Sequence, residues 1–155
     1  MLGNQYFLAR NFLKAAENLS LAMRENPANK GIRRKLIVCY TQTGESEKAL
    51  EIFLSLIKED ADFIINTDPI DDDCPCSELV YDYEARLPEK PVKKNLLIIL
   101  GMLSLYCDLS RSVKYFNEAQ QKDPENIRLK SVLAILNAKI NHKSNHSLTY
   151  QGGTS

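Results

Sequence analysis

Apolar residues recur at steps of three and four along several stretches of the chain. One stripe runs from Leu13 to Met23, a second covers residues 49–57, and a third covers residues 127–140. This spacing places the apolar side chains on one face of an α-helix, because the helix turns once every 3.6 residues. The pattern predicts amphipathic helices, each of which must bury its stripe against a neighbour.

Turn signals divide the chain into similar segments. Asn26-Pro27 and Asp123-Pro124 each end a segment. Between them, Thr43-Gly44-Glu45 supplies a tight turn, since glycine adopts positive φ without strain. A helix, a turn and a second helix therefore recur along the chain, which is the pattern of a repeat architecture.

These segments resemble the tetratricopeptide repeat, a helix–turn–helix unit of about 34 residues. In that family, small residues sit where the two helices touch and large residues fill the space between them. The matching positions in the first segment are Leu2, Gly3, Tyr6, Ala15, Leu19, Ala22 and Pro27. Those in the second are Leu36, Ile37, Tyr40, Gly44, Ala49, Phe53 and Leu56. Those in the third are Leu96, Ile99, Leu100, Leu103, Phe116, Ala119 and Pro124.

We therefore predict an all-α protein, a right-handed helix–turn–helix repeat solenoid. Each helix pair leaves an apolar face that only a neighbouring pair can cover, so the units must stack. About three tetratricopeptide-like units are expected, with one degenerate inserted unit and a capping helix. The expected domain covers 1–140, with repeat one at 1–29, repeat two at 30–63, an acidic degenerate insert at 64–92, repeat three at 93–126 and the capping helix at 127–140. Residues 141–155 are expected to form a disordered tail.

The insert departs from the repeat in both pattern and charge. The acidic run Asp71–Asp73 is followed by Cys74-Pro75-Cys76. Ser77 then begins a short helix, whose apolar stripe is Leu79, Val80, Tyr83 and Leu87. We interpret the insert as a degenerate repeat whose first helix has become an acidic loop. Residues 61–92 carry two basic and nine acidic side chains, while residues 1–60 have a balance of +2 and residues 93–155 a balance of +5.

Composition excludes several classes of protein. Twenty basic and twenty acidic side chains cancel, which argues against a general nucleic-acid binder. No apolar run approaches the roughly 18 to 20 residues that span a bilayer. The start of the chain, Met1 to Gln5, lacks the basic and apolar regions of a secretory signal, and four cysteines do not make a disulfide framework. We therefore expect a cytoplasmic protein that binds neither nucleic acid nor membrane.

The motif with the most evident chemistry is Cys74-Pro75-Cys76, because a thiol pair can bind metal or cycle between dithiol and disulfide. Zinc usually takes four ligands, however, and neither His142 nor His146 lies nearby in sequence. Asp71–Asp73 lack the glycine and glutamate of a calcium loop in register. No nucleophile elbow, phosphate loop or metalloprotease motif occurs. We expect no enzyme, no metal and no cofactor; a thiol- or metal-dependent accessory protein using Cys74 and Cys76 is the alternative.

The resemblance implies a binding groove, because tetratricopeptide arrays bind extended peptides or helices along the concave face that their first helices line. The family's groove and clamp positions fall on Asn4, Phe7, Leu8, Arg34, Lys35, Val38, Thr41, Gln42, Lys94, Leu97, Ser104 and Leu105. Some members clamp a terminal carboxylate, but that clamp is incomplete here. Lys35 stands in place of its asparagine, and Ile98 stands in place of its arginine.

A cluster of basic residues is expected at one rim of this groove. Its members are Arg33, Arg34, Lys35, Lys93 and Lys94. We therefore predict a non-catalytic protein–protein interaction or scaffold module that binds a protein or an acidic peptide. The acidic run Asp71–Asp73 is a competitor for this rim within the same chain. Self-association through the exposed ends of the solenoid is a third interpretation.

Overall fold

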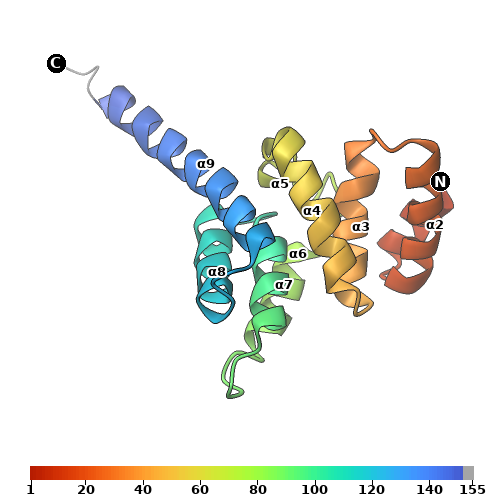
Figure 1. The fold of residues 1–155 in the computed structure, drawn as a ribbon. Helices are drawn as coiled ribbons and strands as arrows, with labels where there is room; N and C mark the ends of the chain where they lie inside the picture. Colours follow the sequence, from red (N-terminus) through yellow and green to blue (C-terminus); the bar gives the residue numbers. More distant parts are fainter. Residues whose placement is uncertain (152–155) are drawn as a thin grey trace.

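The structure is a computed structural model that describes residues 1–151, with side chains to residue 146 (Figure 1). Within these residues every regular element is a helix. The helices are α1 (Leu2–Leu8), α2 (Phe12–Glu25), α3 (Lys30–Gln42), α4 (Ser46–Asp60), α5 (Asp62–Ile65), α6 (Cys76–Glu84), α7 (Lys94–Ser104), α8 (Leu109–Lys122) and α9 (Ile127–Gln151). The protein is thus all-α, as the apolar periodicity predicted.

Local sequence explains where several helices begin. The side chains of Asn11, Asn29 and Asp108 accept hydrogen bonds from backbone N–H groups three residues ahead, at 3.2, 3.1 and 3.0 Å. These bonds satisfy amides that have no partner within the first turn of a helix. Helices α2, α3 and α8 therefore start with a side-chain cap.

The turns inside the first two helix pairs share one geometry. Gly44 adopts φ +78° and Arg10 adopts φ +60° at the equivalent place. In both turns the next amide bonds back to the carbonyl five residues earlier, Glu45 to Tyr40 and Asn11 to Tyr6. This is the helix-ending geometry that glycine adopts most easily. The sequence identified it at Gly44, but Arg10 gave no such signal.

Helices pack in the order of the chain as a tetratricopeptide-like repeat solenoid. The pairs α1–α2, α3–α4 and α7–α8 each pack together, and α2 packs against α3. Unit three stacks directly on unit two, because α7 contacts both α3 and α4. Phe53 of α4 and Phe116 of α8 join the two units, with ring centroids 5.6 Å apart.

Two glycines allow close approach within the helix pairs. A Cβ atom on Gly3 would lie 2.9 Å from the Leu19 side chain, and one on Gly101 would lie 2.9 Å from the Phe116 ring. Such distances are far below van der Waals contact, so larger residues at these positions would push the helices apart. Gly3 was one of the small residues on which the resemblance to the family rested.

The last helix is longer than the sequence predicted. Helix α9 packs against α8 and α4 and runs to Gln151, past the predicted end at residue 140. Its distal part extends away from the other helices (Figure 1). The expected disordered tail 141–155 is therefore helical to Gln151, because no proline or glycine interrupts the chain between Ile127 and Gln151. The remaining predicted tail, 152–155, lies outside the described residues.

Candidate protein-binding surface

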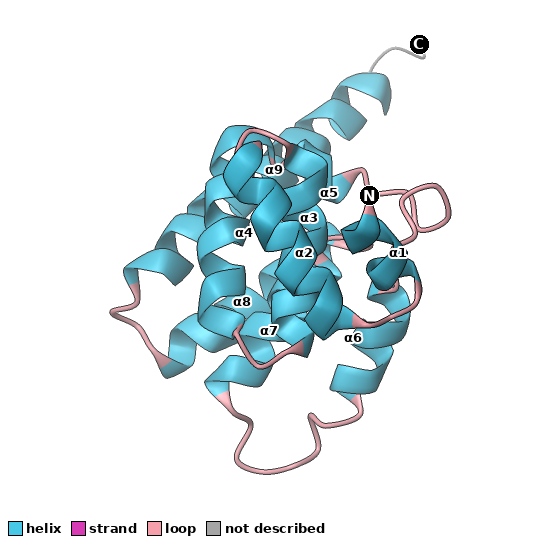
Figure 2. Ribbon diagram, turned by 90° about the vertical axis from the view of Figure 1, so that its right-hand side faces the viewer, coloured by secondary structure: helices cyan, strands magenta, loops and turns pink. Residues whose placement is uncertain are grey.

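The insert folds back along the first helices of the units. Helix α6 packs against α7, and the preceding loop lies beside α1 (Figure 2). Arg10 Nη1, just after α1, donates to the carbonyl oxygen of Asp73 at 3.1 Å. The hydroxyl of Tyr83 in α6 donates to the carbonyl oxygen of Thr41 in α3 at 3.3 Å. The insert thus contacts α3 and α7 and the end of α1.

Arg34 of α3 is the main polar anchor of the insert. Its Nη2 pairs with Asp72 Oδ1 at 2.7 Å, and its Nη1 donates to the carbonyl oxygen of Phe63 at 3.1 Å. The guanidinium also lies 4.4 Å from the centroid of the Phe63 ring. The Arg34 side chain is only 12% exposed. A buried guanidinium needs such partners, because an unpaired charge away from water is costly.

Tyr106 supports the same site from the turn that follows α7. Its hydroxyl donates to the carbonyl oxygen of Arg34 at 2.6 Å. Burial raises the pKa of Tyr106 well above its ordinary value, so the phenol stays protonated and keeps donating this bond. The backbone of Arg34 is therefore tied to unit three, while its side chain is tied to the insert.

The acidic loop, residues 66–75, is ordered by its own side chains. The Asp68 carboxylate accepts from the backbone amides of Ile70 and Asp71, at 2.8 and 2.9 Å. These amides lower the pKa of Asp68, with Asp71 contributing most. Asp72 Oδ2 accepts from the amide of Asp68 at 2.8 Å while its other oxygen pairs with Arg34. The turn thus holds one carboxylate towards α3.

A disulfide joins Cys74 to Cys76 where the acidic loop meets α6. The sequence left metal binding, redox activity and a simple structural role open for this pair. Burial raises the pKa of Cys39 to about 12, so its thiol is protonated at neutral pH. Burial also raises the pKa of Cys107. The described part of the chain contains no group of three or more His, Cys, Asp or Glu side chains arranged to hold a metal.

Half of the predicted groove residues are buried within the protein. These six are Phe7, Val38, Thr41, Leu97, Ser104 and Leu105. The hydroxyl of Ser104 has no hydrogen-bond partner among the described residues. The predicted positions on α3 and α7 therefore face protein, since α6 packs on α7 and bonds to Thr41.

Most of the other predicted groove residues are paired. Lys35 Nζ donates to Asn4 Oδ1 at 3.1 Å, and Lys94 pairs with Asp123 at 2.9 Å. Gln42 Nε2 donates to the Tyr83 hydroxyl at 3.3 Å, while Arg34 pairs with the acidic loop. Leu8 is half exposed. The structure thus brings Asn4 and Lys35 together, but the twelve residues do not form one open groove.

The basic cluster is largely neutralised inside the chain. Arg33 pairs with Glu59 at 2.8 Å, and Arg34 and Lys94 have the aspartate partners described above. Lys93 is exposed and forms no ion pair with any described residue. Of the five clustered cations, Lys93 is therefore the one most available to an outside anion.

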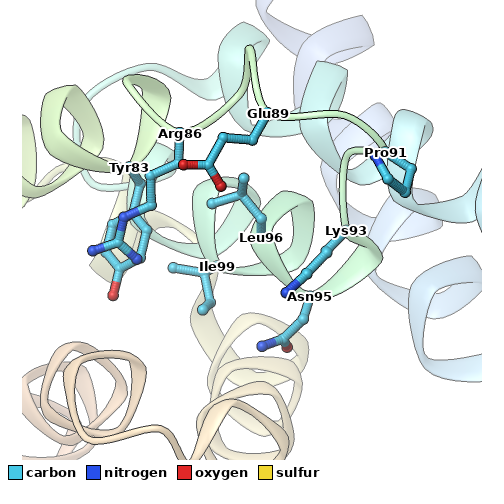
Figure 3. A pocket seen from close by; sticks show the side chains of 8 residues that line it. All are labelled: Tyr83, Arg86, Glu89, Pro91, Lys93, Asn95, Leu96 and Ile99. Carbon is cyan, nitrogen blue, oxygen red and sulfur yellow. The ribbon is translucent and has the colours of Figure 1, made fainter.

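A pocket of about 270 Å³ opens between the end of α6 and the start of α7 (Figure 3). Leu96 and Ile99 of α7 lie deep in it, and Arg86 lies alongside the Tyr83 ring, 4.6 Å from its centroid. The other lining residues are Glu89, Pro91, Lys93 and Asn95. Sequence reasoning used Tyr83 only as part of an apolar stripe and Lys93 as part of the basic rim. It missed Arg86 and Asn95, because neither belongs to a recognisable motif.

The pocket combines the aliphatic side chains of Leu96 and Ile99 with two cations, Arg86 and Lys93, and with the Glu89 carboxylate. Arg86 and Lys93 form no ion pair within the described residues, and Asn95 Oδ1 is held by the Ser46 hydroxyl at 2.7 Å. The amide NH₂ of Asn95 therefore remains a donor. Two cations against one carboxylate give the lining a net positive charge beside aliphatic side chains, a combination that can contact both charged and aliphatic groups.

Residues 6–65 match the model of the tetratricopeptide repeat family. This stretch of the chain is therefore similar to the tetratricopeptide repeat. Comparisons with curated proteins and with solved structures gave no match. The matched range ends at α5, so the third helix pair is recognised as a similar unit only from its packing on the second. No helix among the described residues has the length and apolarity that crossing a bilayer requires.

Proposed function

We propose that the whole chain is a tetratricopeptide repeat protein and acts as a non-catalytic protein–protein interaction module, whose first-helix face binds a peptide or helix of a partner. The observation that carries the proposal is the family match, because tetratricopeptide repeats generally mediate protein–protein interaction. Stacked repeats offer extended binding surfaces for such partners.

The contact surface that we propose has two parts. One part is the pocket between α6 and α7, where Arg86 and Lys93 can donate hydrogen bonds to an anion beside Leu96 and Ile99. The other part comprises the groove residues that are not fully buried, namely Asn4, Leu8, Arg34, Lys35, Gln42 and Lys94. Both parts favour an acidic partner segment that also carries aliphatic side chains, since complementary charge sets association rate and specificity.

The test compares the proteins that are captured from the native lysate by three purified, folded versions of the chain. These are the intact chain, Arg86→Glu/Lys93→Glu, and the matched control Lys58→Glu/Lys143→Glu, which makes the same change in net charge at exposed positions elsewhere. Charge reversal at the pocket should repel an acidic segment and leave the fold intact, because Arg86 and Lys93 form no ion pair among the described residues.

The proposal requires that a protein captured by the intact chain and the control is lost by the pocket variant. A purified segment of that protein should then bind the intact chain at least tenfold more tightly than the pocket variant in calorimetry. Identical capture by all three proteins would place the binding surface elsewhere on the molecule.

A further inference from the structure

We propose that the acidic loop is an intramolecular ligand of the first-helix face. Asp72 occupies a site centred on Arg34, and an acidic segment of a partner binds there by replacing it. This inference rests on the proposed function, because it names the chemistry and the regulation of that same face. It predicts that the site is accessible only to a segment that competes with the loop.

The loop is attached by polar contacts at few points. Arg34 binds Asp72, and Arg10 donates to the carbonyl of Asp73. Ile70, the aliphatic residue at the tip, is 85% exposed and adds no buried apolar surface. The buried residues of the loop, Thr67 and Pro75, lie at its two ends, and all of residues 68–73 except the half-buried Asp72 are exposed. A stretch held without apolar burial, as residues 68–73 are, opens at low cost in free energy. The contacts of residues 68–73 therefore resemble those of a bound peptide more than those of a packed core loop.

The site beneath the loop belongs to the helical body and is built to hold an anion. The Arg34 side chain is oriented by the carbonyl of Phe63, by the Phe63 ring and by Thr67 Oγ1 at 3.5 Å. Its remaining terminal nitrogen points to Asp72 Oδ1. These positioning partners precede the acidic run, so an oriented guanidinium remains when the Asp72 carboxylate leaves. A planar guanidinium of this kind recognises any well-placed carboxylate.

The tether explains why a partner must compete. A covalently attached loop has an effective concentration of about millimolar for a nearby site. If the loop occupies the site in more than about nine tenths of the molecules, an outside peptide binds at least tenfold more weakly than it would to a free site. Two further carboxylates, Asp71 and Asp73, are exposed and available to repel an approaching anion.

The experiment uses the loop's own sequence as the probe. In a loop-replaced variant, Asp68–Asp73 are exchanged for six alternating Gly and Ser residues, which leaves Thr67, the Cys74–Cys76 disulfide and α6 in place. The probe is the synthetic peptide of residues 66–73, acetylated and amidated, so that it carries no cysteine. Binding is followed by amide chemical shifts in NMR titrations up to about 2 mM peptide, the range set by the effective concentration.

The loop-replaced variant should bind the peptide, with shifts centred on Arg34 and Tyr106. The intact chain should bind it at least tenfold more weakly, and the peptide with Asp72→Asn should bind the variant at least tenfold more weakly. The inference is overturned if the folded loop-replaced variant does not bind the peptide, or if it binds the Asp72→Asn peptide with the same affinity. It is also overturned if the intact chain binds the peptide as tightly as the variant does.

A second variant keeps the inference testable if loop replacement prevents folding. Asp72→Asn in the intact chain should speed amide hydrogen exchange at least tenfold in residues 68–73 and leave α3 and α7 unchanged, because the loop loses its ion pair to the body. Unchanged exchange in the loop would contradict the inference. If both loop tests fail while a partner still requires Arg86 and Lys93 for binding, the proposed function stands and the internal-ligand inference is disproved.

Discussion

At the scale of single residues, Arg34 shows how one side chain joins separate parts of the chain. Its side chain contacts Phe63 of α5 and both Thr67 and Asp72 of the acidic loop. Its carbonyl oxygen accepts from the Tyr106 hydroxyl. The sequence singled out Arg34 because the family's groove position and the basic cluster coincide there. Its partners were not visible, because each lies far away in sequence and is brought near only by the fold.

Arg34→Ala should lower the free energy of unfolding by about 2 to 3 kcal/mol, because it removes a largely buried ion pair and two hydrogen bonds. Asp72→Asn should cost less, about 1.5 kcal/mol, since Asp72 is more exposed and an amide oxygen still accepts from Arg34. Urea denaturation of both variants measures the difference. A larger loss for Asp72→Asn than for Arg34→Ala would mean that the loop, and not α5, is the main partner of Arg34.

At the scale of elements, equivalent lysine–aspartate ion pairs join the two helices of two helix pairs. Lys30 at the start of α3 pairs with Asp60 at the end of α4, at 3.0 Å. Lys94 at the start of α7 pairs with Asp123 at the end of α8, at 2.9 Å. Sequence reasoning assigned Lys94 to partner binding, because a lysine at that position says nothing about a carboxylate 29 residues away.

These pairs predict how stability depends on pH. Hydrogen bonds from Lys30 and Lys94 lower the pKa of Asp60 and Asp123, so each carboxylate stabilises the folded chain above its ordinary pKa near 4. That contribution is lost as the pH falls through the lowered folded pKa. In thermal scans at low salt, Asp60→Asn/Asp123→Asn should therefore have a lower melting temperature than the intact chain at pH 7. At about pH 2 the two melting temperatures should be equal. A constant difference across this range would contradict the ion-pair account.

The elements also show what periodicity can and cannot predict. The stripes at residues 13–23, 49–57 and 127–140 lie in helices α2, α4 and α9, because amphipathic spacing is a local property. The sequence predicted that the last helix ends at residue 140, but α9 continues to Gln151. Polar residues can continue a helix when no glycine or proline intervenes, so a polar composition alone does not mark its end. The burial of Leu97 and Ser104 was missed because it depends on where the insert packs.

Helix α9 offers a test of that extension. Its residues buried in the core, Leu129, Val132, Leu133 and Leu136, all precede residue 140. A chain ending at Ile140 should therefore melt within about 3 °C of the full chain, since each kcal/mol shifts the melting temperature by only a few degrees. A chain ending at Lys130 should lose cooperative unfolding, because α8 and α4 would expose their packed faces. Calorimetry of the two truncations separates the packed part of α9 from its extension.

At the scale of the whole molecule, the insert does not separate the repeats. Helix α7 packs directly on α4, so the insert lies against the first helices and the repeats remain continuous. Charge supports this placement, since the segment with a balance of −7 lies between two that are net basic. A zero net charge thus conceals an attraction between the insert and the body, which the composition alone could not locate.

The contact between Phe53 and Phe116 should decide whether units two and three unfold together. Both rings are fully buried, and Phe116 also packs on Gly101. Phe116→Ala should cost about 3 to 5 kcal/mol and Phe116→Leu clearly less, because alanine leaves the larger cavity. Stability in stacked repeats depends on interfaces between neighbours, so Phe116→Ala should speed hydrogen exchange in α7, α8 and α9 more than in α1 and α2. An equal increase in all helices would show instead that the three units form a single cooperative body whose stability does not divide at this interface.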